Sequence, residues 1–147
     1  MPKHVLFVCT ANICRSPTAE ALLRHRLPGD AVTATSAGLL ALAGHPIDPR
    51  AEAALAARKL TAAGHVARQL TPALIAQADV VLAMEKRHLA ALRALAPDAR
   101  DRTFLLGKWL RNAEIVDPYR GSDLDFERSC GLIGDALERW SRHLTES

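Results

Sequence analysis

The residues best suited to chemistry lie in the segment 9–15, CTANICR, which follows a short apolar run. Cys9 ends that run, Arg15 follows six positions later, and Ser16 and Pro17 come next. Ser16 is suited to cap a helix, and Pro17 to occupy its first position. Backbone N–H groups that converge on a helix N-terminus form an anion site. The spacing therefore predicts a thiol at the floor of a phosphate-binding loop.

Each part of this loop suits nucleophilic attack on a phosphate monoester. A thiol beside a helix N-terminus and a guanidinium is held as thiolate, the nucleophilic form. The residues between Cys9 and Arg15 can surround phosphate oxygens with N–H donors, and Arg15 can clamp two oxygens with its planar fork. The Ser16 hydroxyl could also donate to the sulfur, and Asn12 tolerates the left-handed backbone that tight loops need.

A second candidate lies far downstream, in the segment 114–120, EIVDPYR. Asp-Pro is typical of a turn, because Pro118 disfavours helical geometry at Asp117. A loop aspartate can protonate a phenolic leaving oxygen as a general acid and can then activate water as a base. Taken alone, the segment indicates an ordinary turn. Together with the cysteine loop, it predicts the acid of a two-step phosphate hydrolysis.

These motifs resemble those of the low-molecular-weight protein tyrosine phosphatases. The matching stretches, in family order, are VCTANICRSPTAEALL at 8–23, SAGLLALAGHPIDPRA at 36–51, GHVARQL at 64–70, ADVVLAMEKRH at 78–88, LLGKWL at 105–110 and VDPYRGSDLDFE at 116–127. The SAG, MEKRH and DPYR forms are similar to the bacterial subgroup, whose members dephosphorylate tyrosine kinases that control capsule and exopolysaccharide export. The resemblance implies hydrolysis of protein phosphotyrosine through a phosphocysteine, without cofactor or metal.

The resemblance also implies roles for individual residues. Cys9 is expected to be the nucleophile, Arg15 the phosphate clamp and Asp117 the general acid, while Tyr119 packs against the phosphotyrosine ring. The expected substrate-binding residues are Thr10, Ala11, Asn12, Ile13, Cys14, Ser16, Leu40 and Tyr119.

Further residues are expected to support the loop. By resemblance, Ser36 forms a hydrogen-bond network with Asn12 and Ser16 that holds the loop in shape. His65 either pairs with Glu20 beneath the loop or is an ordinary structural histidine.

Two departures from the family pattern concern the pocket. Ala11 stands where the family usually has glycine, and alanine fits only if its φ is negative. Tyr119 is the only tyrosine and is followed by Arg120 rather than by a second tyrosine, which excludes regulation through a tyrosine pair. We expect Arg120, at the pocket rim, to favour acidic peptides.

The position of Cys14 indicates that oxidation could control the activity of Cys9. It lies on the same short loop as Cys9, so after peroxide converts Cys9 to a sulfenic acid, Cys14 could form a protective disulfide with it. The alternative is that Cys14 only packs beneath the loop.

Length and composition favour one compact domain over residues 1–147. The net charge is +3, but basic residues alternate with acidic ones and aromatic residues are few, which argues against a nucleic-acid partner. The histidines show no ligand-like clustering, so no metal site is expected. Three cysteines without a disulfide pattern suit the cytoplasm. No apolar run predicts membrane insertion, and we expect a monomer or weak dimer.

The order of strand and helix patterns predicts an α/β fold. It is a single-domain open parallel sheet of about four strands flanked by helices, with the phosphate-binding loop after the first strand. Such sheets bind ligands beyond the carboxyl ends of their strands, where Cys9 lies. The predicted strands are 4–8, 31–35, 79–84 and 103–106, and the predicted helices are 17–27, 48–60, 72–77, 86–95 and 123–144.

Three other functions remain open at this point. An arsenate reductase of the same fold needs further cysteines on a mobile segment, but 79–100 has none and Cys130 stands alone in a predicted helix. A phosphocysteine carrier of sugar transport needs neither the arginine clamp nor the distant Asp-Pro. A phosphotyrosine-binding module without turnover would not need both Cys9 and Asp117.

Overall fold

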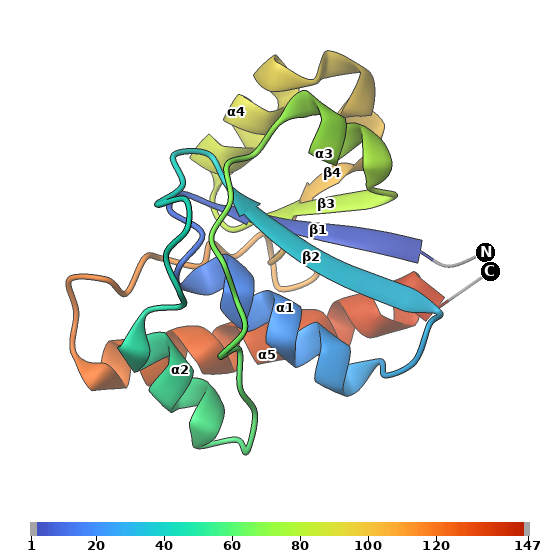
Figure 1. Ribbon diagram of the computed structural model, residues 1–147. Helices are drawn as coiled ribbons and strands as arrows, with labels where there is room; N and C mark the ends of the chain where they lie inside the picture. The colour runs from blue at the N-terminus through green and yellow to red at the C-terminus, as the bar shows by residue number, and fades with distance from the viewer. Residues whose placement is uncertain (1–2, 146–147) are drawn as a thin grey trace.

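The computed structural model describes residues 3–145 and consists of a four-stranded parallel sheet between two layers of helices (Figure 1). The strands are β1 (Lys3–Cys9), β2 (Val32–Gly38), β3 (Val80–Ala83) and β4 (Thr103–Leu105), in the spatial order β2-β1-β3-β4. The helices are α1 (Arg15–Arg26), α2 (Pro49–Ala56), α3 (Pro72–Gln77), α4 (Lys86–Leu95), the 3-10 helix η1 (Pro97–Arg102) and α5 (Asp123–Thr145). The predicted fold class is confirmed.

Strand β1 lies at the centre of the core and packs on both of its faces. Val5 and Phe7 contact the layer of α1 and α5, whereas Leu6 and Val8 contact the layer of α3 and α4. Figure 1 shows the two layers on opposite faces of the sheet. All four side chains are completely buried, and burial of such side chains stabilises the fold by roughly 1.5–3 kcal/mol each. Cys9 continues the first set, so its thiol faces the α1 layer at the carboxyl end of the strand.

Helix α1 begins at Arg15, earlier than the predicted start at residue 17. Cys14 stands at its N-cap, so the predicted cap at Ser16 is wrong, and Pro17 is the third helical residue rather than the first. The first N–H groups of a helix have no intrahelical partner, so a proline there breaks no hydrogen bond. The phosphate-binding loop therefore runs directly into the helix.

One further helical prediction needs correction, and one helix was missed. The helix predicted for 48–60 is shorter and runs from Pro49 to Ala56. Asp48 caps its start by accepting a hydrogen bond from Arg50 N at 2.8 Å. Beyond that end, Lys59 has a left-handed φ of 60°. Helix η1 was not predicted. None of the helices within residues 3–145 is long and apolar enough to cross a membrane.

The segment after β2 holds the cysteine loop in place. The backbone N–H groups of Leu39, Leu40 and Leu42 donate to the carbonyls of residues 9, 10 and 11 at 2.9–3.0 Å. Gly38 makes this approach possible, since a Cβ there would lie 2.6 Å from the carbonyl oxygen of Thr10. The loop is thus braced by backbone contacts along one side.

Candidate active site

A cavity of about 240 Å³ opens at the carboxyl end of β1, where ligands bind in sheets of this kind. It collects residues from the cysteine loop, the segment after β2 and the segment before α5. Its lining consists of Cys9, Thr10, Ala11, Ile13, Cys14, Arg15, Leu40, Leu42, Asp117 and Tyr119. Of the residues predicted to form the site, Asn12, Ser16 and Ser36 do not line the cavity and lie buried behind it.

The buried hydroxyl and amide groups orient the thiol of Cys9. The Asn12 amide donates to Ser16 Oγ at 2.7 Å and to Ser36 Oγ at 3.0 Å. Because Ser16 Oγ accepts from Asn12, its own hydrogen is free to donate to Cys9 Sγ, which lies 2.9 Å away. A donor aimed at sulfur stabilises the thiolate. Ser36 in turn donates to Glu20 Oε1 at 2.8 Å, so the structure contains the network that the resemblance implied.

The backbone of the loop accommodates its unusual alanine. Among the described residues, Asn12 has a left-handed φ of 61°, while Ala11 is not in that region. Alanine in place of glycine is therefore unstrained. Of the two alternatives for His65, pairing with Glu20 is wrong: His65 Nε2 lies 2.6 Å from the Asn12 carbonyl oxygen, so His65 is a structural histidine. This contact braces the left-handed turn at Asn12.

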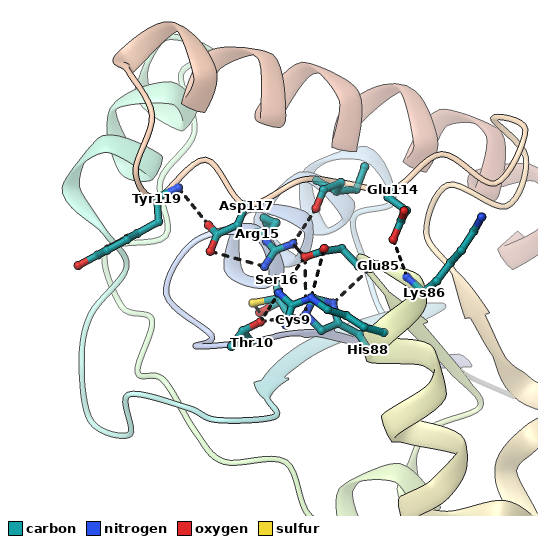
Figure 2. Close-up of polar contacts among 12 residues, drawn as sticks. Cys9, Thr10, Arg15, Ser16, Glu85, Lys86, His88, Glu114, Asp117 and Tyr119 are labelled. Carbon is teal, nitrogen blue, oxygen red and sulfur yellow. Dashed lines mark hydrogen bonds and ion pairs between the residues drawn. The ribbon is translucent and has the colours of Figure 1, made fainter.

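Arg15 is buried and held from one side. Its Nη1 donates to Glu85 and to the carbonyl oxygen of Ile115, the latter at 2.7 Å (Figure 2). Its Nε is buried and has no hydrogen-bond partner among residues 3–145, and its Nη2 lies 3.9 Å from Asp117 Oδ2. The Nε and Nη2 edge is the fork that binds two oxygens of a phosphate. The fixed Nη1 therefore presents a preorganised clamp to the cavity.

Glu85 is a functional residue that the sequence reasoning missed. Burial alone would raise the pKa of Glu85, but hydrogen bonds from Arg87 and Arg15 outweigh it and lower the pKa below its ordinary value. The carboxylate thus stays charged and fixes the Arg15 guanidinium. One signal could have identified it: Glu85 follows β3, which the structure places beside β1, so its side chain starts at the same edge of the sheet as Cys9.

The segment before α5 places an acid over the cavity. Asp117 Oδ1 accepts a hydrogen bond from Tyr119 N at 3.0 Å, which fixes the turn. The carboxylate is 45% exposed, so protons can exchange with solvent. Arg50 of α2 braces this segment by donating to the Tyr119 carbonyl at 2.7 Å while its guanidinium lies 4.3 Å from the centre of the Phe126 ring. The predicted acid and aromatic wall therefore share one braced turn.

Comparison with known proteins agrees with this geometry. Residues 4–147 match the family described as low molecular weight phosphotyrosine protein phosphatase. The chain belongs to this family. The phosphatase is 44% identical to the low-molecular-weight protein-tyrosine-phosphatase Etp of Escherichia coli K12, over 96% of this chain and 94% of that protein.

Solved structures are similar as well. The tyrosine phosphatase Wzb from Escherichia coli K30, in complex with sulphate, has a TM-score of 0.92 and 42% identity, covering 98% of this phosphatase and 99% of that chain. The YwlE arginine phosphatase from Geobacillus stearothermophilus has a TM-score of 0.90 and 34% identity, covering 97% of this phosphatase and 93% of that chain. The chain is thus a low-molecular-weight protein tyrosine phosphatase.

The remaining cysteines and basic residues of the phosphatase have distinct surroundings. Burial, and then the carboxylate of Asp48, raises the pKa of Cys14, so this residue is a neutral thiol in the cavity wall. Cys130 is buried in the packing of α2 against α5. Arg120 is exposed but does not line the cavity, whereas the exposed Arg87 reaches Thr10. Within residues 3–145 no three potential ligands form a metal-binding group.

Proposed function

We propose that the phosphatase hydrolyses protein phosphotyrosine with Cys9, Arg15 and Asp117 in the roles that the family resemblance implies. Cys9 Sγ attacks phosphorus and forms the S–P bond while Arg15 and the loop amides hold the other oxygens. Asp117 donates its proton to the phenolic oxygen as the P–O bond breaks. Water then attacks phosphorus, the S–P bond breaks, and the Asp117 carboxylate takes the proton.

A single observation carries this proposal: Arg15, whose buried Nε has no hydrogen-bond partner among residues 3–145, lines the cavity that holds the Cys9 thiol. A clamp fixed by Glu85 and Ile115 needs no reorganisation when a phosphate enters, and preorganised donors are the ones that stabilise a transition state.

The cavity walls favour an aromatic phosphate. Its apolar sides are formed by Ile13, Leu40, Leu42 and Tyr119, and among residues 3–145 Asp117 is the only carboxylate that lines it. An aryl ring gains from apolar contact, while the guanidinium of phosphoarginine needs several acceptors. The resemblance to an arginine phosphatase in fold therefore does not extend to the predicted specificity.

The proposed partner is a bacterial tyrosine kinase that controls polysaccharide export and carries an acidic, tyrosine-bearing tail. The proposed location is the cytoplasm, with the enzyme acting as a monomer or weak dimer. Arg120 supports the acidic partner, because it is exposed and directly follows Tyr119, which lines the cavity. The three described cysteines are free, which suits a reducing compartment.

A phosphopeptide panel tests this specificity. We expect phosphotyrosine peptides to be cleaved far faster than matched phosphoserine and phosphoarginine peptides, and acidic phosphotyrosine peptides faster than neutral ones. Arg120→Glu is expected to reduce the preference for acidic peptides, whereas Arg139→Glu, with the same change in charge at an exposed site on α5, is not. Faster cleavage of phosphoarginine would overturn the proposed substrate class, and an unchanged acidic preference in Arg120→Glu would overturn the role of Arg120.

Peroxide should reveal whether Cys14 protects the nucleophile. Peroxide oxidises the Cys9 thiolate to a sulfenic acid, and the Cys14 thiol then displaces water from it to form a disulfide. Both residues line the same cavity. We expect dithiothreitol to restore most activity in the wild type but not in Cys14→Ser. Cys130→Ser, which alters a buried thiol outside the cavity, should recover like the wild type. Equal recovery of all three proteins would mean that Cys14 does not resolve the sulfenic acid.

A further inference from the structure

The start of α4 holds a histidine in one defined state. His88 is 1% exposed, and its Nδ1 lies 3.2 Å from the backbone N–H of Glu85. A backbone N–H can only donate, so Nδ1 is the acceptor and carries no hydrogen. Burial, together with the charge of Arg15, lowers the pKa of His88 to about 4, which keeps the ring neutral. The ring hydrogen is therefore on Nε2.

That hydrogen reaches the loop residue next to the nucleophile. His88 Nε2 donates to Thr10 Oγ1 at 2.9 Å, and Arg87 Nη2 donates to the same oxygen at 3.3 Å (Figure 2 shows the histidine contact). A hydroxyl has two acceptor lone pairs and one hydrogen. Both lone pairs of Thr10 are thus used on the α4 side, and its hydrogen is the one group left to form a bond.

Thr10 lines the cavity beside Cys9, while His88 and Arg87 do not. His88 and Arg87 therefore fix the hydroxyl oxygen from the α4 side, which leaves the hydroxyl hydrogen free for a ligand in the cavity. Cys9 Sγ already has a donor in Ser16 at 2.9 Å. A phosphoryl group in the cavity offers further acceptors that the Arg15 fork alone does not use, since a phosphate monoester has three non-bridging oxygens.

We propose that Thr10 is a catalytic residue that donates its hydroxyl hydrogen to a non-bridging phosphoryl oxygen, and that His88 is the positioning residue that sets its direction. This inference rests on the proposed function, because it concerns the same phosphoryl group. It assigns a task to the MEKRH segment: Glu85 fixes the clamp, and His88 fixes a second donor. The start of one helix thereby orients two groups on the loop.

Removing the hydroxyl tests the first half of the proposal. A hydrogen bond to a charged group is worth about 1.5–3 kcal/mol, so Thr10→Val is expected to lower kcat/KM by roughly 10-fold or more. Vanadate, a phosphate mimic, should bind more weakly by a similar factor, while Thr10→Ser should restore most of both. The pH profile of Cys9 alkylation by iodoacetamide should not move. A shifted alkylation profile would mean instead that Thr10 serves the thiolate.

Two amides at position 88 separate positioning from packing. Gln places its amide N–H near the Nε2 position of histidine, so His88→Gln can still donate to Thr10 but no longer caps Glu85 N. Asn places its amide oxygen near Nδ1, so His88→Asn can accept from Glu85 N but cannot reach Thr10. We expect His88→Asn to match Thr10→Val in kcat/KM and His88→Gln to remain close to the wild type. In the Thr10→Val background, His88→Asn should have no further effect.

A kcat/KM that is near wild type in His88→Asn but reduced in His88→Gln would overturn the positioning role. It would assign His88 to helix stability alone. Thermal unfolding reports whether the His88 variants fold. Even if both fail to fold, wild-type activity in Thr10→Val would overturn the catalytic role of Thr10. Failure of the proposed function is distinguishable, because it would appear as a wild-type enzyme that does not cleave phosphotyrosine at all.

Discussion

Replacement of Cys9 by serine is expected to leave the fold intact and to reduce turnover to background. The hydroxyl is similar in size to the thiol and keeps a polar contact with Ser16 Oγ, which lies 2.9 Å from the sulfur. Serine needs an adjacent base to become nucleophilic, and no histidine lines the cavity among the described residues. Hydrolysis of para-nitrophenyl phosphate, with chelator present, measures the loss, and thermal unfolding checks the fold.

Cys130→Ser is the matched control, because this buried cysteine lies in α5 outside the cavity. It should retain wild-type turnover. Cys9→Ser that kept more than a few per cent of wild-type activity would contradict Cys9 as the nucleophile.

Asp117→Ala is expected to reduce turnover by a factor that depends on the leaving group. General acid catalysis contributes about 10²–10⁴-fold, and it matters most when the departing phenolate is a poor leaving group. Phosphotyrosine peptides should therefore lose most of that factor, while highly activated aryl phosphates should lose much less. The slope of log kcat/KM against the leaving-group pKa measures the difference.

Asp123→Ala serves as the control, since this exposed acid at the start of α5 does not line the cavity. Its slope should equal that of the wild type. Equal losses for all leaving groups in Asp117→Ala would show that Asp117 does not protonate the leaving oxygen.

The sequence predicted those parts of the site that are local in the chain. The run before Cys9, the spacing to Arg15 and the order of strands and helices all follow from short-range patterns, and they place the loop at the carboxyl end of β1. The left-handed Asn12 follows in the same way, since asparagine is one of the few residues suited to that conformation.

The parts of the site that the sequence did not predict depend on contacts between distant segments. Glu85 lies 70 residues from the Arg15 that it fixes, and His88 lies 78 residues from Thr10. These pairs form only because β3 lies beside β1 in the sheet, and hydrophobic periodicity does not specify strand order. For the same reason, the sequence left open whether His65 pairs with Glu20 or is a structural histidine. Its partner is a backbone carbonyl that the left-handed Asn12 exposes, which no side-chain pairing rule identifies.

The phosphocysteine itself gives the most direct test of this mechanism. In Asp117→Ala, an activated aryl phosphate still transfers its phosphoryl group, but hydrolysis of the intermediate lacks its base, so the intermediate should accumulate. After an acid quench, mass spectrometry of the peptide that contains Cys9 is predicted to show one added phosphoryl group on that cysteine, and none in the Cys9→Ser protein. Turnover with the phosphoryl group on another residue, or with no phosphoenzyme under these conditions, would contradict the account.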